Sequence, residues 1–163
     1  HVAAERLKQL TGAPISHVPY KGSGPAMQDL MGGTIEMAVG TLGGMLPLHR
    51  SGKTRLFGVA TAKRVDLAPD IPTVAESAGL PEPFEAMLWH VVALPRKTPP
   101  AIVKVLADAS QPAMADTNLL GKLADQGMFA DLHMGDAAAE AYVKAEAAKW
   151  KPIIAKLGNL GKG

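Results

Sequence analysis

A glycine-rich segment at a predicted strand-to-helix junction is the strongest candidate binding site in this sequence. The run YKGSGP (20–25) follows a predicted strand over 15–20 and leads into a helix predicted over 25–31. Free backbone N–H groups and the positive end of a helix dipole meet at such a junction, so it suits a carboxylate or another small anion. The spacing matches neither a P-loop nor a dinucleotide fingerprint. An ordinary turn between a strand and a helix is the competing interpretation.

A second junction of the same kind follows about twenty residues later. The run GTLGG (40–44) lies between a predicted strand over 35–39 and a short helix predicted around 45–50. Because parallel strands end at the same edge of a sheet, we expect the two glycine-rich segments to be neighbours there. Two adjacent segments favour an anion-binding cleft, and close packing of a helix on the sheet is the alternative.

Side chains that could support catalysis or bind a metal are not grouped in the sequence. The absence of cysteine excludes disulfides, thiolate zinc sites, iron–sulfur clusters and a cysteine nucleophile. The serines include no nucleophile elbow, and no histidines have metal-ligand spacing; the histidines are His1, His17, His49, His90 and His133. We therefore predict no enzymatic activity, no cofactor and no metal site. Trp89 is a candidate for either the core or a wall of a ligand pocket.

The elements that would position these segments alternate between helix and strand. In the first part of the chain, helices are predicted over 1–11, 25–31 and 45–50, and strands over 15–20, 35–39 and 54–62. This order predicts an α/β fold with a mostly parallel sheet flanked by helices. A proline-rich segment over 63–83 is expected to cross the surface, with a short helix over 74–78 capped by Thr73.

The second part of the chain is predicted to be mostly helical. Strands are expected over 84–94 and 129–132, and helices from Thr98–Pro99 onward, over 117–126, and over 136–157 with Asp136 as the cap. Pro112 should end or kink the first of these helices, and Pro152 should bend the last. The opening helix has no capping residue before it, so we expect that the chain begins inside an element and is a fragment.

Composition and charge exclude several classes of function. Apolar residues make up 47% of the 163 residues and charged residues 20%, which is typical of a globular protein. The formal charge is 17 − 15 = +2, and the basic residues are scattered, which argues against nucleic-acid binding. No apolar stretch approaches the roughly 18–20 residues of a membrane-spanning helix.

Several separate motifs resemble one receptor family. The stretches HVPYKGSGPAMQDLMGG (17–33), LPLHRSGKTRLFGVATAKR (46–64) and LAPDIPTVAESAGLPEPFEAMLWHVVALPRKTP (67–99) are similar to the extracytoplasmic solute receptors of tripartite tricarboxylate transporters, the Bug receptors. Ala148-Lys149-Trp150 and Ile154 match the family's closing pattern. The resemblance implies a type 2 periplasmic-binding-protein fold, in which two α/β lobes close over a small carboxylate in the manner of a Venus flytrap. It also implies a periplasmic location, membrane transporter subunits as partners, and binding without catalysis.

The resemblance also implies a division of the chain and a set of binding residues. Residues 1–60 would form the second-lobe α/β core, 61–83 a connecting segment, and 84–163 the return to the first lobe with its C-terminal helices. The expected ligand-binding residues are Lys21, Gly22, Ser23, Gly24, Ala26, Thr41, Leu42, Gly43 and Trp89. Where the family often has D-N-x-x-S/P, this sequence has GTLGGM (40–45), which leaves Thr41 as the polar side chain at that rim.

These expectations lead to one main hypothesis and one alternative. The main hypothesis is a receptor that captures a small carboxylate for the transporter. The alternative is an interaction or sensory module whose partner binding a small ligand modulates. Because the family's receptors have about twice this length, we expect a truncated two-lobe receptor that lacks the family's own anion loops. Such a chain should bind carboxylates poorly or not at all. It should also expose apolar surface over 85–157, and so self-associate or pack in a rearranged way.

Overall fold

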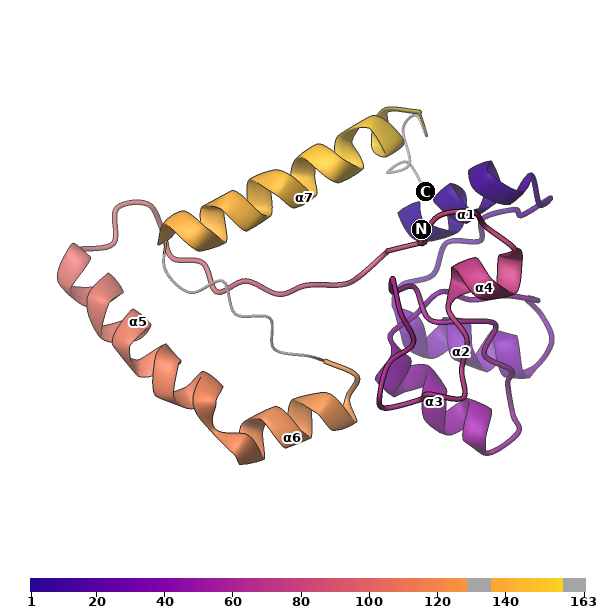
Figure 1. The fold of residues 1–163 in the computed structure, drawn as a ribbon, viewed down its shortest axis with the longest axis horizontal. Helices are drawn as coiled ribbons and strands as arrows, with labels where there is room; N and C mark the ends of the chain where they lie inside the picture. Colours follow the sequence, from indigo (N-terminus) through magenta and orange to yellow (C-terminus); the bar gives the residue numbers. More distant parts are fainter. Residues whose placement is uncertain (129–135, 157–163) are drawn as a thin grey trace. The chain divides into compact units, whose positions relative to one another are not determined.

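The structure is a computed structural model that describes residues 1–128 and 136–156 (Figure 1). It divides into two compact units. The first comprises His1–Leu88 with the described residues from Ile153 onward, and the second comprises Trp89–Pro152. The predicted boundaries at 60/61 and 83/84 are not tested by this division and stay predictions. The helices of the described residues are α1 (Val2–Thr11), α2 (Ser23–Met31), α3 (Leu42–Arg50), α4 (Val74–Ala78), α5 (Pro100–Ala115), α6 (Thr117–Asp125) and α7 (Asp136–Lys156).

The core of the first unit lies between α3 and the proline-rich segment that follows it. Leu46, Val59, Ala68 and Ile71 are buried against one another, and Leu42, Leu56, Val65 and Leu67 pack around them. We predicted that residues 63–83 cross the surface. That prediction is wrong for the part of the segment between residues 68 and 74, because Ala68, Ile71, Thr73 and Val74 are buried. The apolar side chains of this segment turn inward, while the charged side chains of Lys63, Arg64, Asp66 and Asp70 stay exposed.

The predicted sheet is reduced to one parallel bridge in the described residues, between Val59 and Thr73. The Val59 N–H donates to the Pro72 carbonyl at 2.9 Å, and the Val74 N–H donates to the Val59 carbonyl at 2.9 Å. The Ala86 N–H donates to the Ala60 carbonyl at 3.0 Å. These bonds hold three stretches of the chain beside one another.

The strands predicted over 15–20, 35–39, 54–62 and 84–94 are therefore not formed as strands in the structure. The strand predicted over 129–132 lies outside the described residues. A strand exists only where a neighbour completes its backbone hydrogen bonds. Apolar alternation indicates which side of a segment turns inward, but it does not supply that neighbour.

Several helix ends are where the sequence predicts them. Gly12 ends α1 with φ 68°, a left-handed conformation that glycine adopts at little cost. The Thr73 side chain accepts from the Glu76 N–H, and the Glu76 carboxylate accepts from the Thr73 N–H, a complete capping box for α4. Asp116 caps α6, accepting from the N–H groups of Asn118 and Leu119.

One detail of α5 differs from the prediction. The residue before the helix is Pro99 and not Thr98, because Pro100 takes the first helical position. Pro112 lies inside α5 and does not end it, since the helix continues to Ala115, and the alternative that it kinks the helix stays a prediction. The side chain of Asp136, the predicted cap of α7, lies outside the described residues.

Two arginine side chains connect separate segments of the first unit. The Arg6 guanidinium of α1 donates to the Glu85 carbonyl at 3.0 Å and lies 5.3 Å from the centre of the Phe84 ring. Arg64 pairs with Glu76 at 3.1 Å. The first contact joins α1 to the end of the buried core, and the second joins the start of the proline-rich segment to the helix α4 within it.

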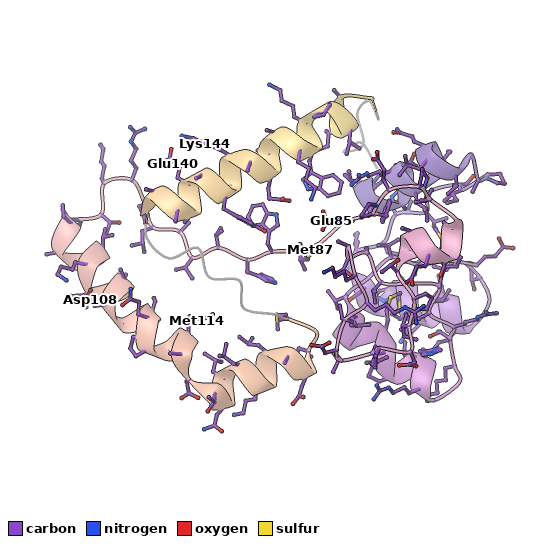
Figure 2. The ribbon with its side chains drawn as sticks, in the orientation of Figure 1. Glu85, Met87, Asp108, Met114, Glu140 and Lys144 are labelled. Carbon is purple, nitrogen blue, oxygen red and sulfur yellow. The ribbon has the colours of Figure 1, made fainter. Side chains whose placement is uncertain are left out.

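The second unit is built from helices with more exposed side chains. Among its described residues, none has a buried side chain. Glu140 and Lys144 form an ion pair one turn apart on α7, in view in Figure 2, and Lys104 pairs with Asp108 on α5 in the same way. The Trp89 and Tyr142 rings meet edge to face with centres 5.8 Å apart. In the part of the chain that the structure describes, no helix combines the length and apolar character needed to cross a membrane.

Candidate functional site

The first side of the site is the start of α2. Gly22 precedes the helix with φ 109° and ψ 174°, a backbone conformation that is essentially restricted to glycine. This turn lets the chain enter α2 at Ser23, two residues before the predicted start at Pro25. No side chain caps this helix. The first N–H groups of α2 therefore keep their capacity to donate to a ligand or to water.

The second side is the start of α3. Thr41 precedes the helix in an extended conformation, and its side chain makes no capping hydrogen bond. Its Oγ1 lies 3.3 Å from the point that a Cβ on Gly44 would occupy, so the hydroxyl faces the first turn of the helix. The helix begins at Leu42, three residues before the start predicted around 45. Leu42 and Gly43 thus belong to its uncapped first turn.

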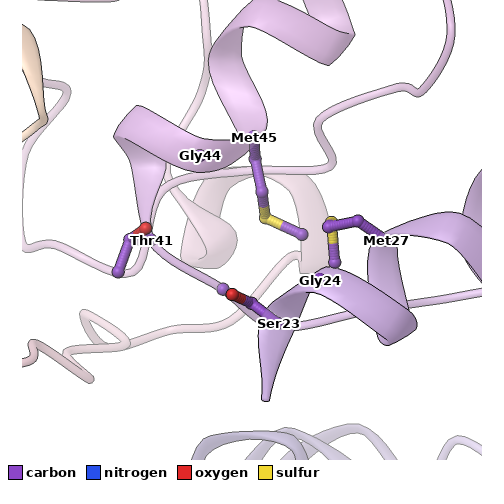
Figure 3. Close-up of a pocket in the computed structure, with 7 residues that line it drawn as sticks. Ser23, Gly24, Met27, Thr41, Gly44 and Met45 are labelled. Atoms are coloured by element: carbon purple, nitrogen blue, oxygen red, sulfur yellow. The ribbon is translucent and has the colours of Figure 1, made fainter.

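A pocket of about 170 Å³ lies between these two helix starts (Figure 3). Its lining residues are Ser23, Gly24, Met27, Gly40, Thr41, Gly44 and Met45. Both glycine-rich segments singled out in the sequence contribute to it. Met27 and Met45 are half-buried and the other lining residues are exposed, so the methionines form the floor and the backbone and hydroxyls form the mouth.

The predicted binding residues fall into three groups. Ser23, Gly24 and Thr41 line the pocket. The segment Lys21–Gly22 precedes α2 and is exposed, while Ala26, Leu42 and Gly43 lie in the first turns of α2 and α3 without lining the pocket. Trp89 belongs to the second unit, where it contacts Tyr142. A binding role for each of these residues stays a prediction.

Sequence reasoning missed the two methionines. Met27 follows Ser23 by four residues, and Met45 follows Thr41 by four residues. Residues four apart lie on the same face of a helix, one turn above each other. The repeated pattern of a hydroxyl residue at a helix start and a methionine one turn later was therefore a signal in the sequence that could have found them.

The electrostatics of the site come from the backbone. None of the lining side chains is charged. The N-terminus of a helix carries the equivalent of about half a positive charge, and two of them meet at this pocket. The arrangement can therefore hold a small anion by hydrogen bonding, and it offers no lining acid, base or nucleophile beyond two hydroxyls.

A tyrosine–aspartate hydrogen bond supports the first helix start. The Tyr20 hydroxyl donates to Asp29 Oδ2 at 2.7 Å, and this bond, with the nearby negative charge, raises the pKa of Tyr20 above its ordinary value. In the described residues, no group of histidine, aspartate and glutamate side chains is arranged to hold a metal ion.

Comparison with solved structures defines the class of protein. The periplasmic binding protein BugD matches 97% of this chain with a TM-score of 0.79 and 28% identity, and the match covers 52% of BugD. MatC from Rhodopseudomonas palustris, solved with bound malate, matches 94% of this chain with a TM-score of 0.76 and 27% identity, and 52% of MatC is covered. The fold is therefore that of the periplasmic binding proteins.

Residues 1–159 match the family model described as tripartite tricarboxylate transporter family receptor (TctC), and the chain belongs to this family. The resemblance to Bug receptors is thereby confirmed. A UPF0065 protein in the clcB-clcD intergenic region of Pseudomonas knackmussii is 37% identical over 130 residues, which is 80% of this chain and 76% of that protein. Three further curated relatives are matched over 44–48% of their own length, so the chain spans about half the length of these relatives. The family is one of transporter receptors and not of enzymes.

Proposed function

We propose that this protein is a periplasmic solute receptor that captures a small carboxylate for a tripartite tricarboxylate-type transporter. The observation that carries the proposal is the meeting of two uncapped helix starts at one pocket. Membership of the receptor family and similarity to periplasmic binding proteins support it. The transporter's membrane subunits are the proposed partners.

The proposed mechanism is binding without chemistry. One carboxylate oxygen would accept hydrogen bonds from the first N–H groups of α2, and the other from those of α3. The hydroxyls of Ser23 and Thr41 would add donors at the mouth (Figure 3). A charge-assisted hydrogen bond contributes roughly 1.5–3 kcal/mol, so a few of them account for capture and release of a small acid. The solute leaves the receptor unchanged.

The experiment is a titration of the 163-residue chain with malate and with acetate, followed by amide chemical shifts. We expect the amides of Ser23, Gly24, Leu42 and Gly43 to shift together, with a dissociation constant on the order of millimolar for this chain. Amides of α4, including Val74 and Ala75, serve as internal controls. If neither acid shifts the amides at the two helix starts, the proposal is wrong.

A charge substitution at the mouth gives a matched pair of variants. Thr41→Asp and Thr41→Asn both provide a good residue before the helix, so α3 should stay folded in each. Both side chains can accept from the first N–H groups of α3 and so compete with the ligand for them, but only the aspartate carboxylate adds a negative charge that repels an anion. We expect Thr41→Asp to abolish the shifts and Thr41→Asn to weaken them without abolishing them. Equal loss in both variants would contradict anion binding at α3.

A further inference from the structure

We infer that the pocket between α2 and α3 takes a monocarboxylate with a compact hydrocarbon body, and that Met27 and Met45 select that body. This inference rests on the proposed function and names the ligand class of the same pocket. The pocket has a polar mouth, where Ser23 and Thr41 lie, and a thioether floor. Figure 3 shows the two methionine side chains reaching toward one another across the space between α2 and α3.

The charge available at the pocket matches one carboxylate. Two helix N-termini together are equivalent to about one positive elementary charge. The lining includes no lysine, arginine or histidine, and Lys21, the nearest basic residue in the sequence, is exposed and does not line the pocket. A di- or tricarboxylate would bring one or two further negative charges, and the described residues that line this pocket include no cation to meet them. Such uncompensated charge is costly to remove from water.

The size of the pocket fits a six-membered ring or a chain of similar bulk. An apolar cavity of about 150 Å³ is known to hold benzene. The pocket between α2 and α3 has a volume of about 170 Å³. It is smaller than the roughly 300–1,000 Å³ of sites for drug-sized ligands. A ring-sized body with one carboxylate at the mouth would therefore fill it.

The floor methionine on α3 is held in place by the backbone below it. A Cβ on Gly40 would lie 3.4 Å from the Met45 sulfur and 3.6 Å from its terminal methyl carbon. The Met45 side chain therefore packs directly over Gly40, where the lack of a side chain leaves room for it. Thioethers adapt to irregular apolar shapes and make favourable contacts with aromatic rings. Met27 supplies the same chemistry from the opposite helix.

The test compares four acids and one alcohol on the 163-residue chain by the amide shifts of Gly24 and Gly43. We expect benzoate and cyclohexanecarboxylate to bind several-fold more tightly than malate or citrate, and benzyl alcohol to bind more weakly than benzoate. If malate or citrate binds more tightly at the same amides, this inference is overturned and the receptor function stands. If no acid shifts these amides, or if benzyl alcohol binds as tightly as benzoate, this inference and the proposed receptor function are both overturned.

Matched variants test whether Met27 and Met45 are the source of the preference for an acid with a hydrocarbon body. Met45→Gln and Met27→Gln keep the side-chain length but add a polar end, and each should weaken benzoate binding by about fourfold, the equivalent of one buried methylene. Met45→Leu and Met27→Leu should retain it. Acetate, which has no hydrocarbon body to reach the floor, should bind all four variants alike. Unchanged benzoate binding by both glutamine variants would overturn the role of the floor.

Discussion

The Tyr20 hydroxyl donates a 2.7 Å hydrogen bond to Asp29 Oδ2, across the whole turn that leads into α2. The main-chain carbonyl of Asp29 accepts from the Thr34 N–H at 2.8 Å, just after the helix ends. Asp29 therefore joins the segment before α2 to the segment after it. Because Ser23 and Gly24 lie between the joined points, this residue fixes the part of the helix that faces the pocket.

Removing the tyrosine hydroxyl should loosen this helix start. In Tyr20→Phe we expect faster amide hydrogen exchange at Ser23 and Gly24, and carboxylate binding weaker by about two- to tenfold, the range for one net hydrogen bond. The Asp29→Asn variant keeps an oxygen that can accept from the hydroxyl and should bind nearly normally. It should also lower the pKa of Tyr20, because the carboxylate raises that pKa. Ultraviolet titration of the two tyrosines, with Tyr20→Phe to identify Tyr142, measures this change.

A second prediction concerns the glycine that turns the chain into α2. A side chain at Gly22 would meet no atom within 4 Å, so the cost of Gly22→Ala lies in the backbone conformation alone. Conformations of this kind cost about 1–3 kcal/mol for other residues. We expect Gly22→Ala to shift the amides of Ser23 and Gly24 and to destabilise the first unit. Gly24→Ala is the control, because the backbone there is helical and the space around it is open. The first unit of this variant should be as stable as in the parent protein.

Local structure could be predicted from the sequence more fully than the sheet. Gly12, Thr73 and Gly127 act through backbone conformation or hydrogen bonds within a few residues, and such signals do not depend on the rest of the fold. The strand over 54–62, in contrast, requires partners far along the chain, and the structure supplies one bridge at Val59. A ladder needs the backbone of a second strand, and the apolar pattern of one segment does not indicate which other segment supplies it.

In the candidate site too, the residues placed by local turns could be predicted from the sequence, and those placed by the packing of two helices could not. Glycine-rich junctions were sufficient to single out Ser23, Gly24 and Thr41, because the turn chemistry is local. Met27 and Met45 look like ordinary core residues in the sequence, and their place on one pocket depends on how α2 and α3 approach each other. Trp89, chosen from its neighbourhood in the sequence, belongs to the other unit.

A third prediction concerns acid stability. The Arg64 guanidinium, followed by the Thr73 N–H, lowers the pKa of Glu76 from its ordinary value of 4.5 to about 2. A carboxylate with a lowered pKa in the folded state stabilises the protein above the unfolded pKa, and that stability is lost as the pH falls to the folded pKa. We expect stability of α4 to fall between pH 4.5 and pH 2. Glu76→Gln should be less sensitive to pH over that interval. Glu82→Gln, which removes an exposed carboxylate outside this network, should behave as the parent does in amide exchange at Val74.

A fourth prediction tests the contact beneath the single bridge. A Cβ on Gly58 would lie 2.8 Å from both the Thr73 carbonyl carbon and the Val74 nitrogen. Both are backbone atoms at the start of α4 and cannot turn aside. Gly58→Ala should therefore destabilise the first unit by about 1–3 kcal/mol, as overpacking does. Faster amide exchange at Val59 and Val74 measures this. Gly121→Ala on α6, where nothing lies within 4 Å, should be neutral or stabilising.

The last prediction concerns the apolar segment that follows the core of the first unit. Its exposed side chains are Met87, Leu88, Val91, Val92 and Leu94, with Leu88 71% and Val92 94% exposed. Exposed apolar side chains along an unpaired stretch favour association with another copy, and charges on such a stretch oppose it. We expect the chain to self-associate as its concentration rises, by light scattering.

The variants for this test place a charge on the same segment. Val92→Lys and Leu88→Lys should each move the measured mass toward the 17.0 kDa of one chain. Gln9→Lys adds the same charge at an exposed position on α1 and should leave the association unchanged. A mass of one chain at every concentration, in the parent protein, would contradict the prediction. Association that survives both lysine substitutions on the segment would place the contact surface elsewhere, because a buried lysine in an apolar contact is costly.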